Sequence, residues 1–149
     1  SKTVYKRKKM KIAGRDIIQF EFPIYVQKVE EHHLQKDDFL KLMKEDKPWW
    51  EIFVLTHDKY TKNVMNYFES KWTDYVKYWT DDYKLGKSEI RHSHYTFLYF
   101  WHDNKLTLTL NGKEKIIDVV EGTLISFPSL MRYSIRNDKV TGYDVTFNN

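Results

Sequence analysis

The stretch from residue 86 to residue 149 consists of short apolar runs, each followed by residues that favour turns. Runs of this length, rich in β-branched and aromatic residues, are typical of strands, and tight turns join such strands into antiparallel pairs. The pattern predicts an antiparallel meander or barrel for residues 86–149. The runs are YTFLYFW, KLTLTL, KEKIIDVV, TLISF and YDVTF, and the turn signals are Asp103-Asn104, Asn111-Gly112, Glu121-Gly122 and Thr141-Gly142.

The clearest single hairpin is predicted around Asn111-Gly112, between KLTLTL and KEKIIDVV. Asn and Gly readily adopt the positive φ angles of a two-residue type I′ turn. The two runs on either side are therefore expected to pair with each other. No internal repeat or low-complexity segment suggests a solenoid or a linker instead.

The first half of the chain has a different texture. Residues 16–29 alternate apolar and polar side chains, which predicts a half-buried strand, and Pro23 predicts an edge or a bulge. Residues 34–44 place apolar side chains on one helical face, and residues 58–83 predict one long amphipathic helix packed on the core. The apolar positions are Phe20, Phe22, Ile24 and Val26 in the strand, and Val64, Phe68, Trp72, Tyr75, Val76 and Trp79 in the long helix.

A chain of 149 residues with 41% hydrophobic and 17% aromatic residues fits one folded domain. We divide it into a basic arm (1–15), a strand and helical part (16–85) and a β-barrel part (86–149). The expected fold class is α+β, mainly β. The absence of cysteine excludes disulfides, thiolate zinc sites and cysteine nucleophiles. No apolar run approaches 18 residues, so we expect no membrane span, and we expect no signal peptide because no apolar segment follows the basic N-terminus.

The first fifteen residues are strongly basic and contain no acidic residue. Such an arm contacts the phosphates of nucleic acid or an acidic protein surface, and its simplest alternative is a solvated terminus. A contact would be made by Lys6, Arg7, Lys8, Lys9 and Lys11, with Lys2 and Arg15 completing the basic set.

His92 and His94 stand two positions apart in the β region, and this spacing in a strand projects both side chains from one face. Two neutral imidazoles on one face can hold a divalent metal ion. Surface or hydrogen-bonded histidines are the alternative that the pair alone leaves open. No glycine-rich phosphate loop or serine nucleophile elbow is present, so nucleotide-dependent and serine-hydrolase chemistry have no support.

The spacing around this pair resembles the cupin signature, in which two histidines, a glutamate and a distal histidine hold the metal. Leu98 or Tyr99 stands at the glutamate position and Tyr133 at the distal histidine position. The resemblance therefore implies a degenerate metal site on His92, His94 and Tyr133. The matching residues are Gly86, His92 and His94 in the first motif and Gly122, Pro128 and Asn137 in the second.

The same stretch resembles the C-terminal half of small 2-oxoglutarate and iron(II) oxygenase-like proteins of tailed phages. The resemblance rests on residues 121–128 (EGTLISFP) and on Phe147-Asn148. It implies a double-stranded β-helix, or jelly-roll, barrel with a mouth lined by His92, His94, Tyr99 and Tyr133. In those oxygenases an arginine shortly after the distal histidine holds the cosubstrate carboxylate. Here Lys139-Val140 follow, and Arg132 or Arg136 would bind a carboxylate from elsewhere.

Three functions follow as hypotheses. The leading one is a degenerate, non-catalytic phage-type protein that acts as a binding or structural module and carries no cofactor. The second is a metal-dependent dioxygenase of the 2-oxoglutarate type, in which His92 and His94 hold a single divalent ion of iron, manganese or zinc. The third is nucleic-acid binding through the basic arm. We expect a protein partner or self-association, no membrane contact, and a location in the host cytoplasm or the virion.

Overall fold

The computed structural model describes residues 10–18, 21–44, 60–68, 71–79, 93–137 and 139–148. These residues form ten strands, the helix α1 and a second helix over residues 60–67. None of the described helices is long and apolar enough to cross a membrane. The labelled elements are β1 (Met10–Ile12), β2 (Arg15–Ile17), β3 (Tyr25–Lys28), α1 (His32–Lys44), β4 (Lys71–Trp79), β5 (Tyr95–Phe100), β6 (Asn104–Leu110), β7 (Lys113–Val119), β8 (Thr123–Pro128), β9 (Arg132–Ile135) and β10 (Val140–Asn148).

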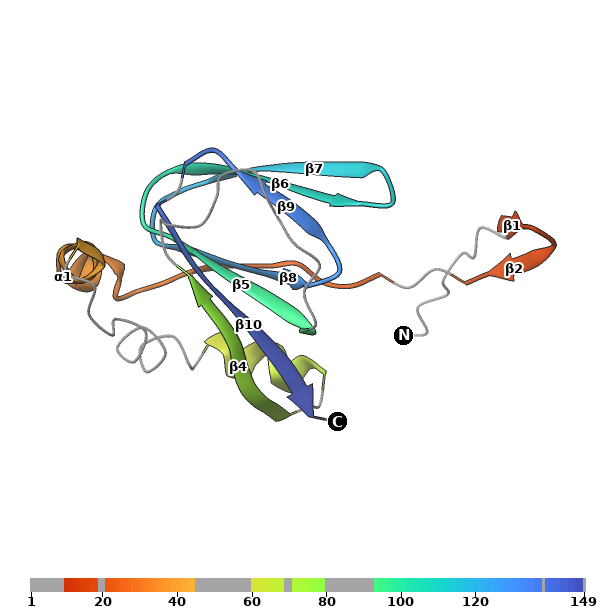
Figure 1. Cartoon of the computed structure of the whole chain (residues 1–149), viewed down its shortest axis with the longest axis horizontal. Coiled ribbons are helices and arrows are strands. Elements are labelled where there is room, and N and C mark those ends of the chain that lie inside the picture. The colour runs from red at the N-terminus through yellow and green to blue at the C-terminus, as the bar shows by residue number, and fades with distance from the viewer. Residues whose placement is uncertain are drawn as a thin grey trace, which may run out of the picture.

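Two antiparallel sheets face each other as two layers (Figure 1). One has the strand order β3-β8-β5-β10-β4 and the other has the order β7-β6-β9. β10 pairs with β5 in the first sheet and β9 pairs with β6 in the second, so one two-stranded ribbon passes from sheet to sheet. A ribbon wound in this way is a jelly roll. The predicted mainly β, antiparallel fold is confirmed by these strand orders.

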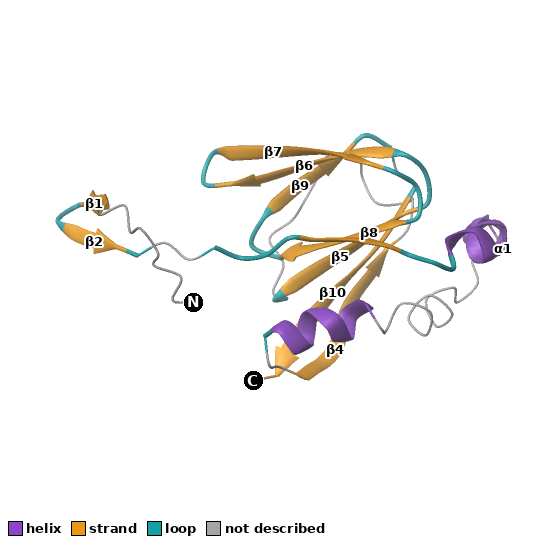
Figure 2. Ribbon diagram, turned by 180° about the vertical axis from the view of Figure 1, so that it is seen from behind, coloured by secondary structure: helices purple, strands orange, loops and turns teal. Residues whose placement is uncertain are grey.

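Side chains alternate across the five-stranded sheet, and its central strands β5, β8 and β10 are buried on both faces. Leu98 and Phe100 of β5 point between the two sheets, into a core shared with Leu106 of β6. Phe97 and Tyr99 point the other way, into a second core. The helix at residues 60–67 covers that outer face over β4 and β10, as Figure 2 shows. A fully buried apolar side chain contributes about 1.5–3 kcal/mol to the stability of the fold. Both faces of the sheet therefore stabilise the protein.

The predicted long helix over residues 58–83 is wrong. The helix spans residues 60–67, and residues 71–79 form β4, an edge strand paired with β10. Trp, Thr, Tyr and Val dominate β4 and favour strands. The β4–β10 pairing has two register shifts, and at each of them β4 contains one extra residue. The extra residues break the two-residue alternation of apolar side chains in β4. The resulting spacing of three is the spacing that resembled a helix. The β part thus includes β3 and β4 and does not begin at residue 86.

The predicted strand over residues 16–29 is also corrected. β2 ends at Ile17 and β3 begins at Tyr25, so two separate strands replace one. Phe22 and Val26, predicted to be buried, are 54% and 59% exposed. β3 lies at the edge of the five-stranded sheet, which agrees with the meaning given to Pro23.

Of the predicted turns, one is confirmed here and another is wrong. Asn111 and Gly112 have φ angles of 52° and 72° and join β6 to β7 in the predicted hairpin. Thr141-Gly142 was expected to be a turn, but both residues lie inside β10 and pair with Tyr99 and Leu98. A glycine is not by itself a turn signal, because it also occurs at bulges and close contacts within strands.

Candidate functional site

His94 lies at one end of the jelly roll, directly before β5. Its backbone N–H donates to the Val145 carbonyl at 3.0 Å, and its carbonyl accepts from the Ser129 N–H at 3.0 Å. These two bonds fix the His94 backbone between β10 and the end of β8, while its side chain is exposed. His92, the other predicted metal ligand, lies outside the described residues.

Tyr133, the residue at the distal histidine position, points between the two sheets from β9. It is 3% exposed and packs edge-to-face against Phe127 with ring centroids 5.7 Å apart. Arg132 precedes it in β9 and is exposed on the opposite face of that strand. Tyr133 is therefore a member of the inner core in addition to its place in the motif.

A buried carboxylate that sequence reasoning missed lies at the same end of the jelly roll. Asp144 of β10 is 1% exposed and pairs in register with Thr96 of β5. The Thr96 hydroxyl donates to Asp144 Oδ1 at 2.6 Å. Thr96 Oγ1 lies 2.9 Å from Ser129 Oγ, which lies 2.7 Å from Ser93 Oγ. A chain of hydroxyls thus runs from the buried carboxylate to Ser93, the neighbour of His94.

One signal in the sequence could have found Asp144. In the run YDVTF, Asp144 lies between Tyr143 and Val145, and a half-buried strand would direct it to solvent. The strand lies inside a sheet covered on both faces, so the opposite face is buried as well. A charged residue in a strand between two buried neighbours is then a candidate site residue, because charges are seldom buried without a reason.

The described residues, which leave out His92, contain no complete metal or cosubstrate site of the kind that the resemblance implies. No three His, Cys, Asp or Glu side chains among them lie close enough to hold a metal ion together. The inward positions of β10 are Val140, Gly142 and Asp144, and none of them is a cation. Arg136, the other predicted carboxylate ligand, is exposed at the end of the jelly roll away from His94.

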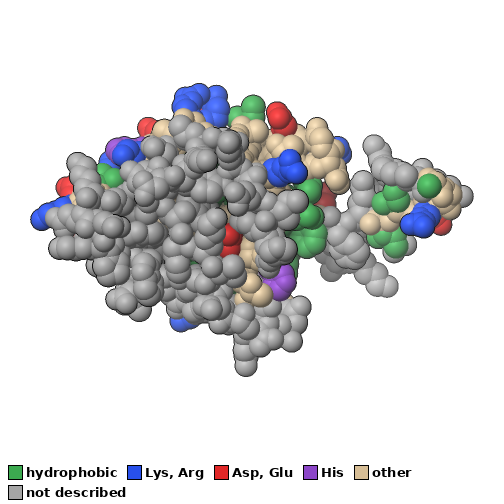
Figure 3. Space-filling model, in the orientation of Figure 1, with side chains coloured by type: hydrophobic (Ala, Val, Ile, Leu, Met, Phe, Trp, Pro, Cys, Tyr) green, Lys and Arg blue, Asp and Glu red, His purple; other side chains and the backbone are tan. Residues whose placement is uncertain are grey.

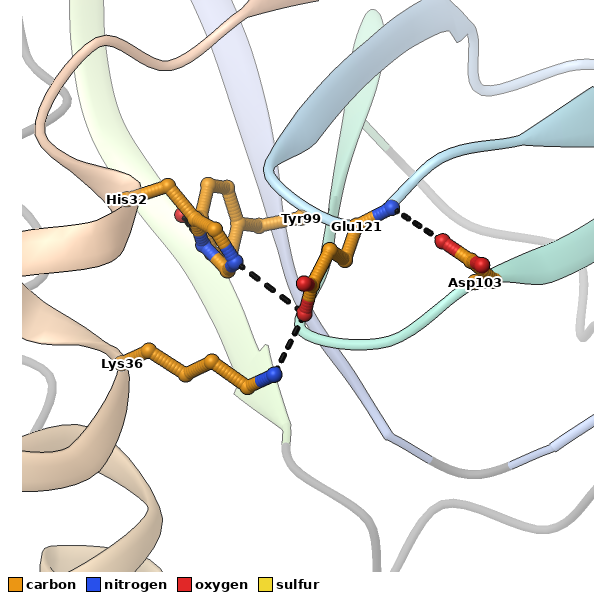
Figure 4. Close-up of polar contacts among 5 residues, drawn as sticks. All are labelled: His32, Lys36, Tyr99, Asp103 and Glu121. Carbon is orange, nitrogen blue, oxygen red and sulfur yellow. Dashed lines mark hydrogen bonds and ion pairs between the residues drawn. The ribbon is translucent and has the colours of Figure 1, made fainter.

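Tyr99 was predicted to line the same mouth as Tyr133, and this grouping is wrong. It lies on the outer face of β5, fully buried beside α1, with its hydroxyl 2.5 Å from His32 Nδ1 (Figure 4). Burial raises the pKa of the Tyr99 hydroxyl well above its ordinary value. Tyr99 is therefore a neutral hydrogen-bonding group under α1.

His32 joins Tyr99 to the turn before β8. Its Nε2 lies 3.5 Å from Glu121 Oε2, and Lys36 Nζ binds the same carboxylate oxygen. Burial lowers the pKa of His32, although the Glu121 carboxylate opposes that effect. The hydrogen bond from Lys36 lowers the pKa of Glu121. His32 thus belongs to a packed contact that connects α1 to the sheet.

The opposite end of the jelly roll is closed by two asparagines. Asn104 Nδ2 donates to Asn137 Oδ1 at 3.2 Å, and Asn104 Oδ1 accepts the Arg136 N–H at 2.9 Å. Asn137, which matched the cupin motif, therefore has a structural role. An open cavity of about 320 Å³ lies beside this contact. It is lined by Asp103, Asn104, Asp118, Val119, Val120 and Arg136.

The predicted nucleic-acid contacts fall mostly outside the described part of the chain. Lys6, Arg7, Lys8 and Lys9 precede it, and Lys11 lies in β1. β1 pairs with β2 in a small hairpin that is separate from both sheets.

Comparison with known proteins gives one structural likeness. No protein-family model and no curated protein matches the sequence. The structure is similar to that of a Pseudomonas putida prolyl-4-hydroxylase, with a TM-score of 0.49 and 11% sequence identity. The match covers 83% of this chain and 88% of that chain.

Proposed function

We propose that this chain is a jelly-roll binding or structural module that does not turn over 2-oxoglutarate. The proposal is carried by Asp144, the buried carboxylate on the inner face of the last strand. The resembled oxygenases use a cation in this region to hold an anionic cosubstrate. Asp144 supplies no cation for such an anion, and an ionised carboxylate at this place would repel it.

The packing between the sheets supports the same proposal. The space is filled by buried aliphatic and aromatic side chains from both sheets, with Tyr133 packed against Phe127 among them. His94 keeps its side chain exposed at the end of the sheet. A binding or structural role uses the surfaces of such a module and needs no open interior.

Calorimetric titration of the untagged chain with 2-oxoglutarate, in the presence of Mn²⁺, tests the proposal. We expect no binding with a Kd below about 1 mM, since the carboxylate remains and no cation replaces it. Asp144→Asn is the matched variant, because it keeps the shape and removes the charge. A Kd below about 100 μM for the unchanged chain would contradict the proposal.

A metal-dependent dioxygenase built on His92 and His94 is the second candidate. The observation that favours it is the approach of His94 and Asp144 to one end of the jelly roll, from the neighbouring strands β5 and β10. Elemental analysis of untagged protein beside a His92→Ala, His94→Ala double variant decides between the two candidates. Near-stoichiometric metal that is lost in the variant would favour the oxygenase, and metal in neither protein would favour the module.

A further inference from the structure

We propose that the outer face of the β7-β6-β9 sheet docks a second copy of this chain, so that the protein forms a two-fold symmetric dimer. The inference is independent of the proposed function, because this face points away from the core between the two sheets. It is carried by the charges on the face, whose pattern is complementary to itself.

The strand register arranges the outer face in rows. Leu106 and Leu108 of β6 are buried in the inner core, so the residues that alternate with them, and the partners of those residues, point outward. Each row runs across the sheet from β7 through β6. Read in that direction, the rows are Asp118-Lys105, Ile116-Thr107-Ser134 and Glu114-Thr109-Arg132.

Acidic and basic side chains occupy opposite sides of this face. Glu114 and Asp118 form an acidic stripe on β7, and Arg132 and Arg136 form a basic stripe along β9 and directly after it. All four side chains are exposed, and Asp118 and Arg136 line the same open cavity at one end of the sheet. Both stripes have a spacing of four residues, and both strands run antiparallel to β6. Two strand spacings, about 10 Å, separate the stripes.

This arrangement of charge selects one way of pairing two copies. Identical sheets that pack face to face with aligned strands are related by a two-fold axis either along the strands or across them. An axis along β6 places Glu114 over the partner's Arg132 and Asp118 over the partner's Arg136. An axis across the strands would place Glu114 over the partner's Asp118, and like charges would meet. Charge complementarity therefore favours the first arrangement.

The centre of the face suits close packing in that arrangement. Thr107 would lie against its own copy, and Ile116, which is 60% exposed, would lie against the partner's Ser134. Lys105 would also meet its own copy, but its Nζ lies 3.8 Å from Asp118 Oδ1, which offsets its charge within the same chain. The centre thus buries an exposed apolar side chain without leaving the lysine unpaired.

The face is open on the molecule. Figures 1 and 2 show the three-stranded sheet as an outermost layer, with no described element on its outer side. In Figure 3, basic, hydrophobic and acidic side chains lie side by side along this edge of the molecule. A small and largely polar face of this kind fits a weak dimer better than an obligate one.

Sedimentation equilibrium of the full chain tests the dimer. We expect a monomer–dimer equilibrium with a Kd below about 1 mM at about 50 mM salt. The Kd should rise at least about threefold at about 500 mM salt, because exposed ion pairs are screened. A strict monomer at about 1 mM protein would overturn the proposal, and so would a dimer that salt does not weaken.

Two charge reversals on the same sheet locate the interface. Arg132→Glu should weaken the dimer at least about tenfold, because an acid would then face the partner's Glu114. Lys113→Glu makes the same change of charge on the opposite face of β7 and should weaken it less than about threefold. Equal losses would overturn the proposal, since net charge or another surface would then explain the association.

A mixture of two variants tests the arrangement itself. Glu114→Arg and Arg132→Glu should each be monomeric, and an equimolar mixture should form a heterodimer within about tenfold of the original affinity, because both contacts are restored with their signs exchanged. One reversal changes the net charge of +4 by two, so both variants stay positive and overall charge does not attract them. Both side chains are exposed, so the dilute variants should keep the thermal midpoint of the unchanged chain. Absence of the heterodimer from a mixture of folded variants would overturn the proposal.

Discussion

The central strands β5, β8 and β10 of the five-stranded sheet are buried on both the outer and the inner face, yet the two faces carry their polar groups differently. On the outer face, aromatic residues reach partners on the covering segments. The Tyr95 hydroxyl donates to the Pro23 carbonyl at 2.9 Å, and the Tyr143 hydroxyl lies 2.9 Å from Thr61 Oγ1. On the inner face, the polar groups gather at one end around Asp144 and Thr96.

This difference shows that the outer covering segments and the inner core are held in place by different interactions. The hydroxyls of Tyr95, Tyr99 and Tyr143 each reach a partner in a covering segment, so these hydrogen bonds help to decide where the segments lie. The inner core is mainly aliphatic and phenylalanine side chains, which are matched by shape and volume. A polar group placed there is expensive unless it is hydrogen-bonded, and Asp144 is the exception that marks a candidate site.

The largest expected effect tests whether the cores on the two faces contribute equally to the free energy of unfolding. Phe127→Ala on the inner face and Phe97→Ala on the outer face each remove a fully buried ring. We expect each to lower the free energy of unfolding by about 3–5 kcal/mol. Urea denaturation measures both. A loss below about 1 kcal/mol for Phe97→Ala alone would show that the outer layer is not a core.

The next effect concerns the contact that fastens α1 to the outer face. Gly122 has a φ of 83°, and a Cβ there would lie 2.8 Å from His32 Cγ. Gly122→Ala is expected to cost about 2–4 kcal/mol, from the left-handed conformation and the displaced ring. Gly112→Ala is the matched control, since its φ is 72° but no atom lies within 4 Å of the new Cβ. That control should cost about 1–2 kcal/mol in the same denaturation experiment, and equal losses would refute the contact.

A smaller effect compares one hydroxyl from each face. Thr96→Val removes the donor to the Asp144 carboxylate, and Tyr143→Phe removes the partner of Thr61. A hydrogen bond to a charged group is worth about 1.5–3 kcal/mol and a neutral one about 0.5–1.5 kcal/mol. Chemical denaturation at pH 7 should therefore show the larger loss for Thr96→Val. The reverse order would mean that Asp144 is not a charged acceptor.

The smallest effect is a pH dependence that originates on the outer face. Burial lowers the pKa of His32 from 6.5, so the unfolded chain binds its proton more readily than the folded chain. This contribution to stability is complete above pH 6.5 and is lost as the pH falls through the lower folded pKa. Glu121, with a pKa lowered from 4.5, adds a similar loss only below pH 4.5. His32→Phe should therefore flatten the fall in the urea midpoint between pH 6.5 and pH 5.

Its neighbour provides the control for this measurement. His33 lies beside His32 in α1 but is exposed. His33→Phe should leave the fall in the urea midpoint as it is in the unchanged chain. If both variants flatten it equally, the pH dependence does not come from the contact with Tyr99 and Glu121.

Local patterns were sufficient for much of the fold. Asn111-Gly112 predicted the β6–β7 hairpin because the turn depends on the φ preferences of these two residues alone. The residues from 34 to 44 predicted most of α1 for a similarly local reason. The motif register singled out Tyr133, but the strand on which it lies, β9, is in none of the predicted strand runs.

The sequence alone thus determined the Asn111-Gly112 turn, most of α1, and the antiparallel β structure of the C-terminal part. Three features were decided by the tertiary structure. β4 is a strand because β10 offers it an edge, and its bulges erase the alternation by which a strand is recognised. Tyr99 and Tyr133 lie in different cores because Tyr99 points to the outer face of the five-stranded sheet, whereas Tyr133 points between the two sheets. Asp144 is buried because its strand lies between two layers, and burial on both faces depends on contacts far apart in the chain, which no local pattern records.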